Sequence, residues 1–551
     1  MAPTHDGNKE IEGRYKERKA YKERAYAYSP VPASGGSSSV CDSTTLRKQN
    51  EEISENGVGQ AKLNRSEGVH EKCPVSFSIA AKMTEKGSTR LQYIAAAAAN
   101  MCTLATGAMM GWTSPVLPRL GKDLKDNPLG RLISQDESSW IGSLLAVGAL
   151  FGCFVAGYLA DRIGRKLSLL CSTVLFLIGW ALIAAASAVP MLYAARVVLG
   201  FAMSFTFTVV PMYCGEIAEI SVRGALGSFL QLFITIGLLY SYVIGPYVSY
   251  TVFWILCAIH PIIFFAAFVT MPESPFFLLK AGKREQAVAA LARLRGKSVA
   301  SVQKEADEIQ AEVDESVRNK ATIADLYRVK ANFRATLYTS LLAGFQQLSG
   351  INVVLFYMEA IFISAGTDIP TAIATIIVGV VQALASAVTP VVVDRLGRKM
   401  LLIFSGIGEI VTLGALGTYF FLKEVQKNDV TGIAILPVVA LVIFIATYCV
   451  GWGPLPWTVM GEMLPANVKS KASSIAVFTC WLLAFFITKF SSDLENAFGR
   501  CTLYWMFGVF CVVSVVFTVV VLPETKGKSV QQIQSELDGS CTAQFVAGEK
   551  M

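Results

Sequence analysis

Charged residues and histidines are scarce in this chain of 551 residues. Only 16% of the residues are Asp, Glu, Lys or Arg, whereas about a quarter are charged in a typical soluble domain. There are three histidines, His5, His70 and His260, and the 12 cysteines include no pair at CxxC spacing. The residues that metal sites and Ser-His-Asp arrangements need are therefore almost absent. We expect no enzyme, no catalytic residues, no metal and no cofactor.

Long apolar runs fill the chain between about residues 91 and 522. Each run has about 20 residues, enough for a helix to cross a hydrocarbon core of about 30 Å. The net charge of +7 comes without a basic patch interleaved with aromatics, so nucleic acid is not an expected partner. The pattern predicts an all-α membrane protein whose surroundings are the lipid bilayer. The twelve candidate spans start near Leu91, Ser138, Leu167, Met191, Ala225, Thr251, Phe333, Pro370, Met400, Gly432, Ala472 and Leu503.

Polar segments divide the chain into five parts. They are a disordered cytosolic tail (1–90), a six-helix half (91–271), a cytosolic helical insert (272–332), a second six-helix half (333–522) and a second cytosolic tail (523–551). Within the insert, Arg284–Arg295 and Ser301–Arg318 read as helices. Lysine and arginine gather in alternate loops between the spans, which predicts a multi-pass protein of the cell membrane with both termini in the cytosol.

Three short motifs occur twice, in the same order in each half. DRIGRK at 161–166 matches DRLGRK at 394–399, and GEIAEISVRG at 215–224 matches GEMLPANVKS at 461–470. The third pair is PESP, which starts at Pro272, and PETK, which starts at Pro523. An ordered duplication across two membrane halves is typical of secondary transporters.

The duplicated motifs place acids and bases at the cytosolic ends of the spans. Arginine offers planar donors that match a carboxylate, and pairs between the halves would close the cytosolic side. The alternative is that these charges only fix the topology and anchor helix ends. The predicted gate residues are Asp161, Arg162, Arg165, Glu216, Arg223, Asp394, Arg395, Arg398, Glu462 and Lys469.

The ordered set of motifs resembles the sugar porter family of the major facilitator superfamily. Arg196–Gly224 resembles its fourth-span signature, QQLSGIN at 346–352 its seventh-span motif and GWGPLPW at 451–457 its tenth-span motif. With GWTSP at 111–115, the pattern most resembles facilitated trehalose and glucose transporters of arthropods. The resemblance implies two pseudo-symmetric six-helix halves and transport of a small-molecule sugar, with no obligate protein partner.

The resemblance also implies a sugar site near the middle of the membrane. Amides donate and accept hydrogen bonds at once, and tryptophan offers a face to a sugar ring. The alternative for a single buried glutamine is that its side chain forms a hydrogen bond between two helices and does not contact sugar. The substrate-binding residues implied are Gln231, Gln346, Gln347, Asn352, Gln382, Trp457 and Trp481. Cys449 and Cys480 stand where glucose transporters have polar residues, so the resemblance implies a site that is less polar on that side than a glucose site.

Glycine and proline interrupt two of the spans. Gly350 in the seventh span and Gly451, Gly453, Pro454 and Pro456 in the tenth predict breaks there. We expect these two spans to bend and occlude the sugar.

The first span decides how transport is driven. Proton-coupled relatives carry an Asp there, where this chain has Thr113, and no acid lies between Leu91 and Leu120. Facilitative uniport is therefore expected, because proton coupling lacks a titratable group beside the site. Two alternatives remain: a proton-coupled symporter that uses Glu409 in the ninth span, and a non-transporting sugar sensor on the same fold.

Overall fold

The computed structural model describes residues 87–124, 126–219, 221–318, 323–366 and 369–539. Within these ranges it contains twelve helical segments that are long and apolar enough to cross a membrane. The twelve-span prediction is therefore confirmed. Of the two tails expected from the sequence, residues 1–86 and 540–551 lie outside the described part.

The first half has six spans, and the first of them is made of α2 and α3. Its helices are α2 (Arg90–Gly111), α3 (Thr113–Lys122), α4 (Gln135–Ile163), α5 (Arg165–Ala184), α6 (Val189–Ile217), α7 (Arg223–Ile244) and α8 (Tyr250–Phe268). Glycines let α4 and α6 approach closely, since a Cβ on Gly148 would lie 2.0 Å from the carbonyl oxygen of Val197. Small residues at such crossings are the usual means of packing helices in a membrane.

The second half repeats this plan with two broken spans. Its helices are α13 (Lys330–Leu348), α14 (Ile351–Ala365), α15 (Thr371–Leu396), α16 (Arg398–Phe420), α17 (Leu436–Val450), α18 (Leu455–Met463), α19 (Ala466–Phe498) and α20 (Arg500–Val520). Gly350 separates α13 from α14 at a φ of 81°, with the Phe507 ring against it. Residues 451–454 separate α17 from α18. Both predicted breaks are confirmed.

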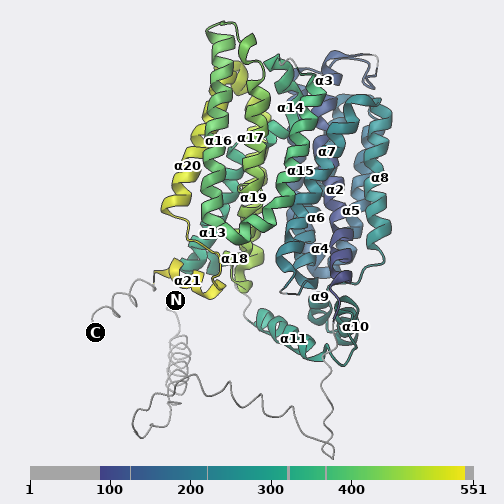
Figure 1. Cartoon of the computed structure of the whole chain (residues 1–551). Coiled ribbons are helices and arrows are strands. Elements are labelled where there is room, and N and C mark those ends of the chain that lie inside the picture. Colours follow the sequence, from purple (N-terminus) through teal and green to yellow (C-terminus); the bar gives the residue numbers. More distant parts are fainter. Residues whose placement is uncertain (1–86, 125, 220, 319–322, 367–368, 540–551) are drawn as a thin grey trace, which may run out of the picture. The chain divides into compact units, whose positions relative to one another are not determined.

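Short helices gather at the end of the bundle that carries the loops at 161–166 and 394–399, called here the hexapeptide end (Figure 1). They are α9 (Pro275–Lys280), α10 (Arg284–Arg295), α11 (Gln303–Arg318), α12 (Ile323–Arg328) and α21 (Val530–Asp538). Helix α10 confirms the predicted helix over 284–295, and α11 begins two residues later than expected. Helix α21 lies in the segment that the sequence pattern assigned to a tail.

A buried arginine fixes the insert to the first half. Arg295 at the end of α10 donates to the carbonyl of Ile217, the last residue of α6, at 2.8 Å. The same guanidinium pairs with Glu305 on α11 at 2.7 Å and with Glu219 at 3.3 Å. The insert is thus held against the end of α6 in the first half.

Candidate substrate site and gates

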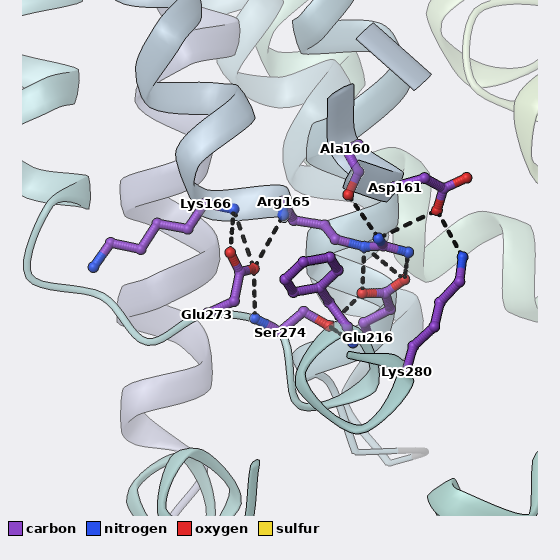
Figure 2. A network of polar contacts seen from close by, with 9 residues as sticks. Ala160, Asp161, Arg165, Lys166, Glu216, Glu273, Ser274 and Lys280 are labelled. Carbon is purple, nitrogen blue, oxygen red and sulfur yellow. Dashed lines mark hydrogen bonds and ion pairs between the residues drawn. The ribbon is translucent and has the colours of Figure 1, made fainter. Parts of the chain in front are cut away.

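Arg165 is the centre of a polar network in the first half (Figure 2). Its Nη2 lies 2.8 Å from Oε1 of Glu216 and its Nε lies 2.9 Å from Oε2, so the pair is bidentate. Its Nη1 donates to the carbonyl of Ala160 at 2.8 Å, and Ser274 donates to the same Glu216 carboxylate. The Arg165 side chain is only 4% exposed. Burial, the planar fork and the extra donor make this a rigid assembly.

The second half builds the same network from the second copy of each motif. Arg398 pairs with Glu462, with Nη2 2.8 Å from Oε1. Thr525 donates to Oε2 of Glu462 at 2.7 Å, in the position that Ser274 holds in the first half. The Arg398 side chain is 14% exposed. The duplicated sequence therefore produces a duplicated structure that is less buried in the second copy.

These two pairs correct one prediction. Arg165 pairs with Glu216 and Arg398 with Glu462, so each pair closes within its own half. The expectation that they join the halves is wrong for this conformation. The reason is local: each arginine opens a helix directly beside the end of the span that carries its acid, and the tight hexapeptide turn places it there.

The other predicted gate residues lie around these networks. Asp161 accepts from Lys280 at 3.0 Å, and the Arg162 guanidinium lies 5.4 Å from the centre of the Tyr158 ring. The Arg395 carbonyl accepts from Lys526, and Lys469 donates to the carbonyl of Gly461. Arg223 is exposed at the start of α7. Asp394 lies in α15, and its side chain is outside the described part.

Glutamates from the third motif cap the helices that follow the hexapeptides. Glu273 accepts from the backbone N–H groups of Arg165 and Lys166, each at 3.1 Å. Glu524 accepts from those of Arg398 and Lys399 at 3.1 and 3.0 Å. Carboxylates at helix N-termini satisfy free N–H groups and interact favourably with the helix dipole.

Three predicted amides, Gln346, Gln347 and Asn352, lie buried at the break between α13 and α14 and are called here the amide cluster. Asn352 donates to Oε1 of Gln347 at 2.6 Å, and Gln347 donates to Sγ of Cys480 at 3.1 Å. Gln346 donates from Nε2 to the carbonyls of Trp452 and Gly453, each at 2.8 Å. The cluster thus lies between the two broken spans and α19.

The other predicted substrate residues lie on α7, α15, α18 and α19, and they differ in burial. Trp481 is buried on α19 next to Cys480, and its Nε1 has no hydrogen-bond partner among the described residues. Gln382 on α15 is also buried, and within the described part of the chain its Oε1 accepts no hydrogen bond. Gln231 on α7 is half-buried. Helices α7 and α15 pack against each other across the two halves. A hydrogen bond joins Gln347 to Asn352, while Gln346 bonds the break of the tenth span. Gln231 and Gln382 lie on the neighbouring pair of helices, α7 and α15.

A family model described as sugar (and other) transporter matches residues 79–537. The chain belongs to the sugar transporter family. This sugar transporter is 35% identical to the facilitated trehalose transporter Tret1-2 homolog of Drosophila sechellia, over 84% of this chain and 94% of the relative. It is 36% identical to the facilitated trehalose transporter Tret1 of Culex quinquefasciatus, over 84% and 89%.

Solved structures agree with the family. The proton:xylose symporter XylE bound to 6-bromo-6-deoxy-D-glucose is 26% identical with a TM-score of 0.68, covering 81% of this chain and 99% of that one. A partially occluded inward-open form of XylE from E. coli is 25% identical with a TM-score of 0.65, covering 80% and 100%. The sugar porter resemblance and the major facilitator fold are confirmed.

Phe207 is a contact in the transporter that sequence reasoning missed. It lies on α6 of the first half, and its ring centre is 5.3 Å from that of Trp481 and 6.2 Å from that of Trp457. Both tryptophans belong to the second half. A phenylalanine in an apolar span gives no sequence signal, so only the packing of the two halves shows that it bridges them.

Lys489 was also missed, and it joins the halves at the far end, opposite the hexapeptide end. Its Nζ lies 2.6 Å from Oδ1 of Asp136 and 3.1 Å from Oγ of Ser139, both on α4. It also lies 4.9 Å from the centre of the Trp140 ring. The signal was present in the sequence, because a lone lysine inside an apolar span calls for a partner.

Backbone contacts add to this far-end closure. Tyr242 of α7 donates to the carbonyl of Leu355 on α14 at 3.0 Å. Ser114 of α3 accepts from the N–H of Glu359 on α14 at 3.3 Å. With Lys489, these bonds connect three helices of the first half to the second half. The transporter is therefore held together at its far end in this conformation.

The two capping glutamates are expected to give opposite pH dependences. Burial raises the pKa of Glu273 above its ordinary value despite the N–H donors around it. Burial also opposes ionisation of Glu524, but N–H donors from Lys526, Lys399, Arg398 and Thr525 bring its pKa below the ordinary value. The folded state thus binds more protons at Glu273, and stability falls as the pH rises from the ordinary to the raised pKa.

Glu524 contributes stability above its unfolded pKa, and this contribution is lost as the pH falls through the lowered one. Thermal unfolding of detergent-solubilised protein across the acid range checks both signs. Glu273→Gln should weaken the loss of stability on raising the pH, and Glu524→Gln should weaken the loss on lowering it. If the stability of the two variants depended on pH in the same way, the assignment of opposite effects to Glu273 and Glu524 would be wrong.

Proposed function

We propose that this chain carries trehalose, or a hexose such as glucose, across the plasma membrane by facilitative uniport and alternating access. The observation that carries the proposal is the buried amide cluster beside the two broken spans. Relatives at 35% and 36% identity are named facilitated trehalose transporters. Sugar hydroxyls need groups that both donate and accept, which buried amides provide without a charge.

The proposed substrate-binding residues are those of the cluster and its surroundings. Gln346, Gln347 and Asn352 would bond the hydroxyls, while Trp457 and Trp481 would offer ring faces. Gln231 and Gln382 would close the site from the packed pair α7 and α15. Breaks at 349–350 and 451–454 leave backbone groups near this site, where discontinuous helices place transporter substrates.

The charged residues of the hexapeptide end are proposed as the cytosolic gate. Each of the two pairs keeps its own half rigid, so closure across the halves falls to exposed members such as Arg162, Arg223 and Arg395. Such exposed pairs contribute only about 0–1 kcal/mol each. Weak contacts suit a gate that opens in every cycle, and basic loops on this side would place both termini in the cytosol.

If transport is uniport, the rate of sugar uptake should not depend on a proton gradient. The first span, Arg90–Lys122, holds no Asp or Glu, and Thr113 at the start of α3 donates to the carbonyl of Met110 near the end of α2. Uptake of radiolabelled trehalose and glucose into proteoliposomes should therefore have the same initial rate with and without an imposed pH gradient. Accumulation above the external concentration under an inward proton gradient would favour symport.

Symport is kept as a second candidate because of one buried acid. Glu409 on α16 is 1% exposed, and an acid within a span is a functional candidate by default. The related XylE is described as a proton:xylose symporter. A sensor is the third reading, and it would bind sugar in the same proteoliposomes with no flux.

A further inference from the structure

The break in the tenth span is held from two sides. On one side, Gln346 donates to the carbonyls of Trp452 and Gly453. On the other side, the N–H of Trp452 donates to Oγ of Ser405 on α16 at 3.2 Å. A Cβ on Gly451 would lie 2.3 Å from the Cβ of Ser405, so the break also packs tightly on α16. The position of Trp452 therefore depends on both neighbours.

Glu409 completes the chain of bonds one turn further along α16. The Ser405 hydroxyl donates to Oε1 of Glu409 at 3.1 Å, and the thiol of Cys511 on α20 donates to Oε2 at 3.5 Å. Ser405 is fully buried and Glu409 is 1% exposed. Burying a carboxyl costs free energy that must be offset by its hydrogen bonds. Through its bond with Ser405, Glu409 is linked to Trp452 in the break of the tenth span.

The amide of Gln346 has two hydrogens, and the two carbonyls at 2.8 Å take both. Gln346 can donate to a sugar only when the broken segment moves away. The Ser405–Glu409 anchor opposes that movement, because Trp452 would have to give up its bond to Ser405. The anchor thus competes with sugar for the Gln346 donors.

We propose that Glu409 is a positioning residue for sugar transport, which holds the break of the tenth span through Ser405 and thereby limits the access of sugar to the Gln346 amide. The proposal rests on the proposed function for its sugar. It makes no use of proton transfer. A purely structural alternative, a bond that only ties α16 to α20 through Cys511, makes different predictions.

Hydrogen exchange of purified protein without sugar tests the anchor itself. Peptides that contain the Trp452 amide should exchange faster in Glu409→Leu and Ser405→Ala than in the wild type. Glu409→Gln should restore slow exchange because its amide oxygen still accepts from Ser405. Ser514→Ala is the matched control, since Ser514 on α20 donates to the carbonyl of Cys511 in its own helix. Unchanged exchange in Glu409→Leu would overturn the proposal.

Uptake of radiolabelled trehalose and glucose by the same variants tests the consequence. Glu409→Leu should lower KM by up to about tenfold, the order of one hydrogen bond, without a matching rise in the maximal rate. Glu409→Gln and Ser514→Ala should keep the wild-type KM. In a Gln346→Ala background, Glu409→Leu should leave KM unchanged, because the two residues act in one chain.

The outcomes separate the two proposals. A lower melting temperature of Glu409→Leu with an unchanged KM would show a structural role only and overturn the positioning role. A wild type that carries neither sugar would overturn the proposed function, while the exchange result would still decide whether Glu409 anchors the break.

Discussion

Arg165→Leu is expected to lower the free energy of unfolding by about 3–5 kcal/mol, the range found when one partner of a buried ion pair is removed. The Glu216 side chain is only 15% exposed in the wild type, and among the described residues the variant leaves it Ser274 as a side-chain donor. The carbonyl of Ala160 loses its donor as well. Unfolding of the purified protein in mixed micelles by titration with a denaturing detergent measures the change.

The second half supplies the matched control. Arg398→Leu removes the same type of residue from the same motif, but its pair is 14% and 29% exposed, against 4% and 15% in the first half. Water can solvate Glu462 more easily, so the loss should be smaller, about 1–2 kcal/mol. The double variant Arg165→Leu with Glu216→Leu should recover much of the loss, because no buried charge remains. Equal losses in the two halves would show that burial does not set the value of the pair.

The architecture was predictable from the sequence because membrane spans leave strong local signals. Apolar runs of about 20 residues define helices, and glycine and proline mark breaks at Gly350 and Gly451. The residues of both networks were also predictable, since Arg165, Arg398 and their acids recur in duplicated motifs. The pairing of each arginine with its acid was not predictable, because it depends on how the ends of adjacent spans pack.

Contacts between the halves were harder to predict for a physical reason. Phe207 and Trp481 come from spans that lie far apart in the sequence, and their apolar side chains fit any buried surface. The same limit applies to the Gln346 amide, whose partners are backbone carbonyls and carry no side-chain signature. The substrate residues therefore stay a proposal that rests on their shared location.

Lys489→Met is expected to shift the protein toward states that are open at the far end. The substitution keeps the apolar stem but removes the ammonium that joins α19 to Asp136 and Ser139 of the other half. The Lys489 side chain is 7% exposed, but Asp136 is 65% exposed, so solvent weakens the pair and the bonds of the ammonium contribute about 1–1.5 kcal/mol. The equilibrium between closed and open states should therefore move by about tenfold. The two halves would still be held by the bond from Tyr242 to the carbonyl of Leu355.

Accessibility of an introduced cysteine reports this shift. Ser114 is fully buried where α3 meets α14, so Ser114→Cys should react slowly with a membrane-impermeant thiol reagent in the parent and about tenfold faster with Lys489→Met, as the equilibrium shift requires. Lys423→Met is the control, because Lys423 donates to the carbonyls of Ser364 and Ala365 within one half. If both lysine variants react at the parent rate, Lys489 is not a latch, and other contacts between the halves keep the far end closed. If both react faster, the gain follows from the loss of any far-end lysine and not from the bond between the halves.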